Sequence, residues 1–475
     1  MSFFARVKLN KTFFALFLVA FLIRGAVVLV KMDSFDADPD QYRAFAENIR
    51  EYGVFGYGET PTAFRPPLYP ALLRCFYVLT PRVSSLSENS SCFLLSQRGA
   101  VALLHWILGI LTVLMVYKLA LMLSFPRQWA FLASLLTAVD PILLAQSRVV
   151  MTETLAAFFA VMIIWRLTVA MMPRQKKIGP FFRIGLLAGL AVLCRPVFLI
   201  FGLLIFLGLL NYCRMRKLLL KFVLFFLVGF ALVPLGWGVR NQIRMGEMIV
   251  TTTHGGYTLF LANNHSLYRY NRKMGFFLAP WNPEDFHRRW ETIKAEDSEE
   301  YQHHAGPAWE IRQDEVAYEF AHKDMSEDPR GAILASGIRL GYLWQFLPYR
   351  VDPDESGWER ACRWSIGIFY AVELPLALLG FLYICAPLVS LTRRRILISP
   401  YWSNWSWPVF LIIAITLPQI LYWTNMRMRA PAMTIVPIFA IIGLRMLISP
   451  KKGEPIAVGG PPTPEPGGVQ NERAQ

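Results

Sequence analysis

The chain has 475 residues, of which 55% are hydrophobic and only 17% are charged, whereas soluble domains average about 25% charged residues. The apolar residues are concentrated in long blocks, and the 35 Phe, 14 Trp and 18 Tyr residues suit a protein with extensive membrane interfaces. This composition excludes an ordinary soluble domain and indicates an all-α polytopic membrane protein.

The net charge of +15 is spread over short basic clusters that lie beside the apolar blocks. A nucleic-acid-binding face would need one continuous basic stripe, which the sequence lacks. Basic loops are instead typical of the cytoplasmic side of a membrane protein. The clusters are Arg6, Lys8 and Lys11; Arg174, Lys176 and Lys177; Arg214, Arg216, Lys217 and Lys221; Arg393, Arg394 and Arg395; and Lys451 and Lys452.

The first apolar block, 12–30, has no small-residue cleavage site and is long for a secretory signal, so we expect a retained membrane helix. About ten membrane crossings with a cytoplasmic N-terminus would leave every basic cluster on the cytoplasmic side. Several blocks are short, which is tolerated when a helix is buried among others. The predicted spans are 12–30, 97–123, 128–146, 149–171, 180–195, 197–212, 218–236, 363–390, 406–424 and 430–448.

Two long hydrophilic stretches interrupt the apolar blocks, and we expect both to lie outside the cytoplasm. The first, 31–96, begins with acids and contains "TAFRPPLYPALLRCFYVL", which predicts a helix lying along the interface. The second, 237–361, is rich in Trp, Tyr and His and predicts a helical cap. Residues 1–450 would thus form one membrane-embedded module, followed by a disordered cytoplasmic tail at 451–475 that is rich in Pro and Gly.

Polar residues gather at the predicted outer ends of the helices. Acids there can act as a general base, and arginines can neutralise a phosphate leaving group. The alternative is that the acids are solvated and the arginines extend to water from helix ends. The groups are Asp33, Asp36, Asp38 and Asp40; Asp140, Arg148 and Glu153; Arg195; Arg240 and Asn241; and Arg427 and Arg429.

Glu153 is the acid that a solvated loop explains least well. It stands near the start of a strongly apolar helix, "ETLAAFFAVMII". An unpaired carboxylate there is costly, so intramembrane acids are by default functional candidates. The positive end of the helix dipole lowers that cost.

Six motifs occur in the order seen in glycosyltransferases of the GT-C fold. The sequence most resembles the protein mannosyltransferase and aminoarabinose transferase-like enzymes, over roughly residues 30–440, and these enzymes use polyprenyl- or dolichyl-phosphate sugars. The motifs are "DPDQYRAFAENIREYGVFG", "FRPPLYPALL", "DPILLAQSRVVMTETL", "GLAVLCRPVFLI", "PLGWGVRNQIRMGEMIVTTTHGGYTLFLANN" and "RMRAPAM".

The resemblance implies an inverting sugar transfer on the extracytoplasmic face, with an acid of the first outer loop as general base. The Asp-x-x-x-Tyr spacing of that loop assigns this role to Asp38, four residues before Tyr42, with Asp40 as the rival. A second acidic position of the family matches Glu153. Pro39 follows Asp38, where the protein mannosyltransferases have Glu, and this departure argues against protein Ser/Thr as the acceptor.

Basic residues of the motifs are the expected partners of the donor's lipid phosphate. Arg65 matches the family's basic position ahead of the Pro-rich stretch. The acceptor, whether lipid, glycan or protein, is left open, and a bacterial inner membrane is the expected location. The further candidates for substrate binding are Arg195, Arg240 and Arg429, with Tyr42 fixing the register of the loop.

No cofactor is expected, although some members of the wider fold use a divalent cation. The histidines show no HExxH or similar metal-binding spacing; they are His254, His265, His287, His303 and His304. The main alternative function is a multi-pass transporter or lipid flippase, which would place ionisable groups near the midplane in matching halves of a repeat. No such repeat is evident. A glycan ligase or polymerase and an inactive relative are the remaining alternatives.

Overall fold

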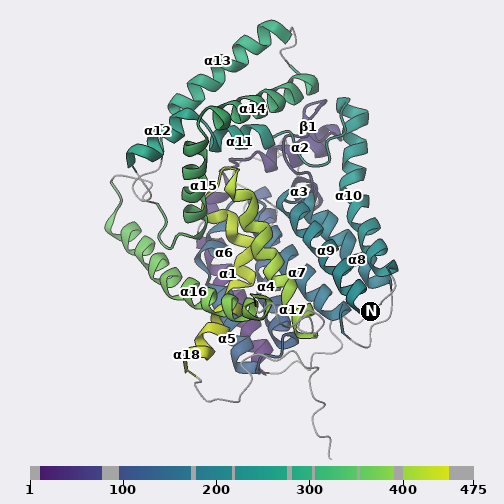
Figure 1. Ribbon diagram of the computed structural model, residues 1–475, viewed down its shortest axis with the longest axis vertical. Helices are drawn as coiled ribbons and strands as arrows, with labels where there is room; N and C mark the ends of the chain where they lie inside the picture. Colours follow the sequence, from purple (N-terminus) through teal and green to yellow (C-terminus); the bar gives the residue numbers. More distant parts are fainter. Residues whose placement is uncertain are drawn as a thin grey trace, which may run out of the picture.

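The structure is a computed structural model, which is almost entirely helical and has its helices arranged as a long bundle with a cap at one end (Figure 1). Within the described residues, the strands β1 (Gly56–Tyr57) and β2 (Thr60–Pro61) pair antiparallel, with Gly56 opposite Pro61. The structure describes residues 11–30, 32–77, 96–172, 178–216, 220–274, 281–301, 305–349, 354–389 and 400–448.

Each apolar block of the sequence contains a helix, so the predicted all-α polytopic fold is confirmed. The block at 128–146 is divided into two helices, because Pro141 begins a new helix directly after Asp140. The bundle contains α1 (Lys11–Val30), α4 (Gln97–Met122), α5 (Arg127–Val139), α6 (Pro141–Gln146), α7 (Glu153–Ala170), α8 (Gly179–Val192), α9 (Val197–Arg216), α10 (Lys221–Met245), α16 (Gly357–Val389), α17 (Pro400–Thr416) and α18 (Val436–Ile448), with the 3₁₀ helices η1 (Met32–Phe35), η4 (Leu417–Ile420) and η5 (Met426–Thr434).

Fewer helices than the ten predicted blocks are long enough to cross a membrane alone. Among the described residues, six helices are sufficiently long and apolar, and a seventh span results if η5 and α18, which meet at a 70° bend, are counted as one. The helices α5 and α8 are shorter. Such short helices are tolerated in a membrane when neighbouring helices, rather than lipid, surround their unpaired backbone polar groups.

Helix α7 lies at the centre of the bundle. It contacts α4, α8, α17 and η5, and 72% of its apolar stretch is buried, compared with 33% for α1. Its apolar residues surround the whole helix, which is typical of a helix buried on all sides. The N-terminus of α7 is therefore enclosed by several segments of the chain.

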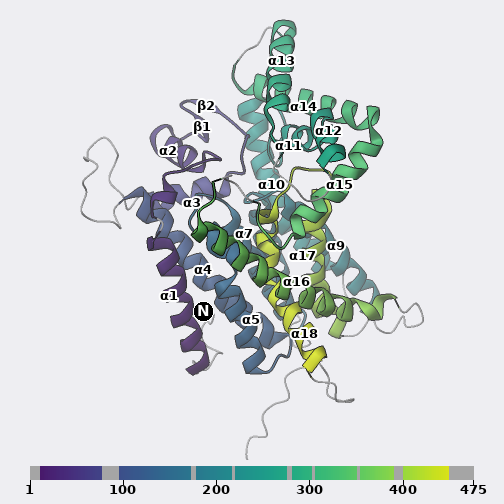
Figure 2. The ribbon, with the colours of Figure 1, turned by 90° about the vertical axis from the view of Figure 1, so that its left-hand side faces the viewer.

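Both hydrophilic stretches lie at the same end of the bundle (Figures 1 and 2). The first contains η1, α2 (Tyr42–Tyr52), the two strands and α3 (Leu68–Tyr77), the helix expected along the interface. The second forms the cap, which consists of α11 (Gly255–Ala262), α12 (His265–Met274), α13 (Glu284–Tyr301), α14 (Pro307–Glu327) and α15 (Pro329–Trp344). The cap has its own apolar core, which includes Phe260, Phe286, Trp290 and Val316.

The second hydrophilic stretch begins later than the predicted boundary at 237. Helix α10 continues to Met245 and ends where Gly246 adopts a φ of 87°. Glycine adopts this left-handed conformation without steric cost, which ends the helix. Residues Arg6 and Lys8, the basic clusters at 174–177 and 393–395, and the tail at 451–475 lie outside the described residues.

Helices α8 and α10 pack in close backbone contact at small residues. A Cβ atom on Gly185 would lie 2.2 Å from the carbonyl oxygen of Phe226, and one on Gly229 would lie 2.3 Å from that of Phe182. Gly185 and Gly189 form a GxxxG pattern, which is typical of closely packed membrane helices. The pattern therefore serves packing.

We predict that Gly185→Ala destabilises the protein by about 1–3 kcal/mol, because the added methyl group forces α8 and α10 apart. Gly236→Ala in α10 is the matched control, since a Cβ atom there meets nothing within 4 Å. Thermal unfolding in detergent measures both variants. Equal unfolding temperatures for the two would contradict the close packing at Gly185.

Candidate active site

Glu153, the first residue of α7, is fully buried. Its Oε1 lies 2.8 Å from Nη1 of Arg195 and 3.7 Å from Nε of Arg427. The two arginines come from distant segments, the break between α8 and α9 and the 3₁₀ helix η5. A buried carboxylate needs such cationic partners, because desolvation of an isolated charge is expensive.

The local sequence explains how both arginines reach Glu153. Pro196 follows Arg195 and separates α8 from α9, so that the Arg195 side chain leaves the helix end. Asn425 accepts a hydrogen bond from the backbone N–H of Arg427 and thereby caps η5. The Arg195 and Arg427 side chains are 16% and 34% exposed, so both can still meet a substrate.

Asp38 of the first loop caps helix α2. Its Oδ2 accepts hydrogen bonds from the backbone N–H groups of Arg43 and Ala44, at 2.9 and 3.1 Å. Its Oδ1 is buried and has no hydrogen-bond partner within the described part of the chain. Burial raises the pKa of Asp38, and the backbone hydrogen bonds offset only part of that rise. One oxygen of this carboxylate thus carries no hydrogen bond from the described residues.

Asp40 forms an ion pair with Arg65. The Oδ1 of Asp40 lies 2.8 Å from Nη2 of Arg65, and each side chain is 18% exposed. The Arg65 guanidinium also lies 4.8 Å from the centre of the Phe64 ring. This pair holds an arginine at the start of the Pro-rich stretch, in the position that the resemblance assigns to phosphate binding.

Tyr42 is close enough to both ion pairs to be influenced by their charges. It is 4% exposed, and its ring packs edge-on against Tyr69 with 5.3 Å between the ring centres. Burial raises the pKa of the Tyr42 hydroxyl. The charges of the two ion pairs have smaller, opposing effects on it: Arg65 and Arg195 lower the pKa, and Asp40 and Glu153 raise it. Four of the predicted residues thus act electrostatically on a fifth.

His254 joins this cluster from the cap. It precedes α11, and its ring packs edge-to-face on Phe64, with 4.5 Å between the ring centres. Burial, assisted by the positive charge of Arg65, lowers the pKa of His254 to about 3, so the imidazole is neutral at pH 7. The histidine belongs to the motif "PLGWGVRNQIRMGEMIVTTTHGGYTLFLANN", but the sequence analysis gave it no role.

Two carboxylates of α14 make partly buried connections: Glu310 joins the cap to the first loop, and Asp314 joins α14 to α11 within the cap. Glu310 accepts hydrogen bonds from the hydroxyls of Thr62 and Thr253 and, at 3.0 Å, from the N–H of Ala63. Asp314, one helical turn later, accepts the N–H of Gly256 at 2.7 Å. Nothing in the sequence pairs these acids with their partners, so they were missed.

Arg240 and Arg429 use their donors on backbone carbonyls. Arg240 donates to Thr62 and Phe55 of the first loop at 2.8 and 2.9 Å. Arg429 is fully buried and donates to the carbonyls of Leu343 and Gln345, both at 2.8 Å. The structure therefore does not bring them into the cluster around Tyr42, and phosphate binding by either residue stays a prediction.

Within the described residues, His265, Asp324 and Glu327 form the one group of three close enough to hold a metal ion. Asp324 is already paired with Arg289, and His265 lies 2.9 Å from the Oε2 of Glu327. The group belongs to the cap, where the helix α11 lies between it and His254 in sequence. Its buried acid, Asp324, is already neutralised by Arg289. His303 and His304 lie outside the described residues.

We predict that Asp314→Asn stabilises the cap at pH 8 by about 1–2 kcal/mol, after screening by solvent. Burial raises the pKa of Asp314 to about 6, so the folded protein binds this proton more tightly than the unfolded chain does. The carboxyl therefore costs stability as the pH rises through 6, whereas the amide oxygen of Asn still accepts the Gly256 N–H.

Thermal unfolding at pH 8 and pH 4 measures this effect, which should vanish at the lower pH. Glu315→Gln is the matched control, because Glu315 is an exposed acid on the same helix, with a side chain that is 60% exposed. A stabilisation by Asp314→Asn that is equal at both pH values would contradict the raised pKa.

Residues 65–243 match the sequence profile of a family described as dolichyl-phosphate-mannose-protein mannosyltransferase. No curated protein matches the chain. The oligosaccharyltransferase of Archaeoglobus fulgidus with a tethered acceptor peptide is similar in structure, with a TM-score of 0.50 and 13% identity over 92% of this chain and 50% of that one. Its apo form gives a TM-score of 0.50 and 12% identity over 95% and 52%.

ArnT from Cupriavidus metallidurans, bound to undecaprenyl phosphate, aligns over 91% of this chain and 77% of that one, with a TM-score of 0.39 and 15% identity. The chain spans about half the length of the Archaeoglobus structures, and at such identities the likeness concerns the fold. The family profile covers Arg65, Glu153 and Arg195 and begins after Asp38 and Asp40. The matched segment and the shared fold thus confirm the resemblance to GT-C fold glycosyltransferases that the sequence motifs predicted.

Proposed function

We propose that this protein transfers a sugar from a polyprenyl- or dolichyl-phosphate donor to an acceptor, with inversion, at the extracytoplasmic face of a bacterial inner membrane. The observation that carries the proposal is the arrangement around Tyr42, where two ion pairs from separate segments meet at the capped end of the bundle. The description of the matched family, which names a dolichyl-phosphate-mannose donor, supports the same chemistry.

The donor's phosphate would bind among Arg65, Arg195 and Arg427. All three side chains are partly exposed, and each is held by a carboxylate that fixes its position. Arginine matches phosphate oxygens with paired N–H donors and keeps its charge at all physiological pH values. These residues would stabilise the lipid phosphate as it leaves the sugar.

Asp38 is our candidate for the general base. A base needs a proton-accepting oxygen with no other partner, and Oδ1 of Asp38 meets that condition among the described residues. Asp40 is less suited, because its Oδ1 already accepts a hydrogen bond from Arg65 at 2.8 Å. In this scheme, Asp40 positions Arg65, and Glu153 positions Arg195 and Arg427.

We predict that Asp38→Asn lowers the rate of sugar transfer by about 10²–10⁴-fold, the usual contribution of a general base. Asn can still cap α2, because its side-chain oxygen accepts the same N–H groups, so the variant should fold normally. The assay follows release of polyprenyl phosphate from a panel of polyprenyl-phosphate hexoses and pentoses. Envelope extract from cells that lack the protein supplies the acceptor.

Asp40→Asn and Asp36→Asn complete this experiment. Asp40→Asn should reduce the rate less, whereas Asp36→Asn should leave it unchanged, because Asp36 pairs with Arg98 at the surface. If Asp40→Asn abolished transfer while Asp38→Asn remained active, Asp40 would be the base. Full activity of both Asp38→Asn and Asp40→Asn would contradict a mechanism in which either carboxylate is the general base.

We predict that Arg65→Ala raises the KM for the donor by about tenfold or more and changes kcat less, because one charge-assisted contact to phosphate is lost. The double variant Arg65→Ala with Asp40→Asn should show the same defect. If the double variant regained donor affinity, the defect of Arg65→Ala would come from the unpaired Asp40 and not from a missing phosphate contact. Arg98→Ala, which removes a surface arginine of α4, is the control.

A further inference from the structure

A hollow of about 430 Å³ lies between α7 and α8. Arg166 of α7 and Arg183 of α8 both line it, and the remaining lining is apolar; it consists of Val169, Ala170, Pro180, Ile184, Leu186, Leu187 and Leu190. Both arginines are exposed on helices that belong to the apolar bundle. Two cations thus share one apolar depression on the side of the bundle.

Among the residues that the structure describes, neither arginine has an anionic partner. Arg166 lies over the ring of Trp165, with 4.9 Å between the guanidinium carbon and the ring centre, and Arg183 makes a long hydrogen bond to the carbonyl of Gly179. No ion pair to a carboxylate involves either residue within the described segments. Two like charges in a region of low dielectric repel each other unless an anion joins them.

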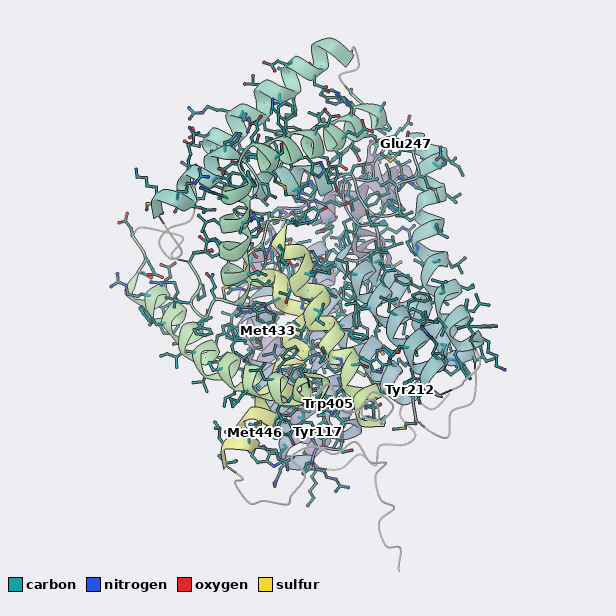
Figure 3. All side chains as sticks on the ribbon, viewed as in Figure 1. Tyr117, Tyr212, Glu247, Trp405, Met433 and Met446 are labelled. Carbon is teal, nitrogen blue, oxygen red and sulfur yellow. The ribbon has the colours of Figure 1, made fainter. Side chains whose placement is uncertain are left out.

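The stretch of sequence around the two arginines contains no carboxylate that could serve as that anion. Between Glu153 and Glu247 the chain contains no Asp or Glu at all. Glu153 begins α7, 13 residues before Arg166, which corresponds to about 20 Å along the helix. Figure 3 shows Glu247 beside the cap and Tyr212 near the opposite end of the bundle. Tyr212 belongs to α9 and lies two residues before Arg214.

The start of α8 adds a third positive contribution. Helix α8 begins at Gly179 and has neither a side-chain cap nor an acid in its first turn. Unsatisfied N–H groups and the helix dipole make such an end attractive to an anion. Pro180, in the first turn of α8, lines the hollow together with the two arginines and three leucines of α8.

We propose that this hollow binds the phosphate head group of an anionic diacyl phospholipid, with an acyl chain against Leu186, Leu187 and Leu190. The charge and the apolar wall match the two parts of such a lipid, and basic pockets between membrane helices are known to bind acidic head groups. The alternative is that each arginine merely extends to water from its helix. That alternative does not explain why the two arginines line the same hollow. The proposal does not depend on sugar transfer, because lipid binding is measured directly.

Native mass spectrometry of the purified protein tests the site, with phosphatidylglycerol and phosphatidylcholine of identical acyl chains as probes. We expect the wild type to bind phosphatidylglycerol more tightly, and Arg166→Gln with Arg183→Gln to weaken that binding by about tenfold or more. Arg214→Gln is the matched control, because Arg214 is an exposed arginine of α9 that does not line the hollow; it should bind like the wild type.

Equal binding of the two phospholipids, or wild-type affinity in the double variant, would overturn the proposal. Preferential binding of undecaprenyl phosphate through the same two arginines would also overturn it, because the site would then belong to a polyprenyl lipid. Each single variant is measured as well, with its unfolding temperature in detergent. A binding defect in a single variant that unfolds like the wild type supports the site even if the double variant fails to fold.

Discussion

The buried carboxylate of Glu153 constrains the structure around it. It stands at the start of the central helix α7, where water cannot stabilise its charge, so cations from elsewhere in the chain have to reach it. Arg195 reaches Glu153 because Pro196 separates α8 from α9. Arg427 reaches it because η5 is a 3₁₀ helix rather than a regular α-helix. One acid thereby brings together segments that lie far apart in sequence, and it fixes two partly exposed arginines beside Tyr42.

The same requirement acts deeper in the bundle. Asp140 caps α6 and accepts the hydroxyl of Tyr370, while Arg429 lies 4.5 Å from the centre of the Tyr370 ring. Glu373 of α16 is buried nearby, and neither of its oxygens has a hydrogen-bond partner among the described residues. Because Arg429 also donates to backbone carbonyls of α15 and its end, it anchors η5 and so positions Arg427. These interior charges are thus connected through Arg429 to the segment that carries Arg427.

The sequence predicted the parts of this structure that depend on local pattern. Apolar blocks located the helices, and the cost of a buried acid identified Glu153, whereas the division of the block at 128–146 was not predicted. The partners of Arg240 and the two carboxylates of α14 could not be predicted, because they join segments whose separation in sequence carries no information about contact. Glu373 was visible as a lone acid in an apolar block and was overlooked.

The charges around Tyr42 suggest which ligand the cluster can hold. Arg65, Arg195 and Arg427 contribute three positive charges, and Asp40 and Glu153 contribute two negative ones. The nearby His254 adds none at pH 7, because burial lowers its pKa to about 3. These two ion-paired acids leave one positive charge, which matches the single charge of a phosphodiester, the linkage in a lipid-phosphate sugar. The carboxylate of Asp38 balances that charge until, as the proposed base, it takes the acceptor's proton. Bond cleavage gives the lipid phosphate a second negative charge, so the attraction increases along the reaction, and only such an increase accelerates the chemical step.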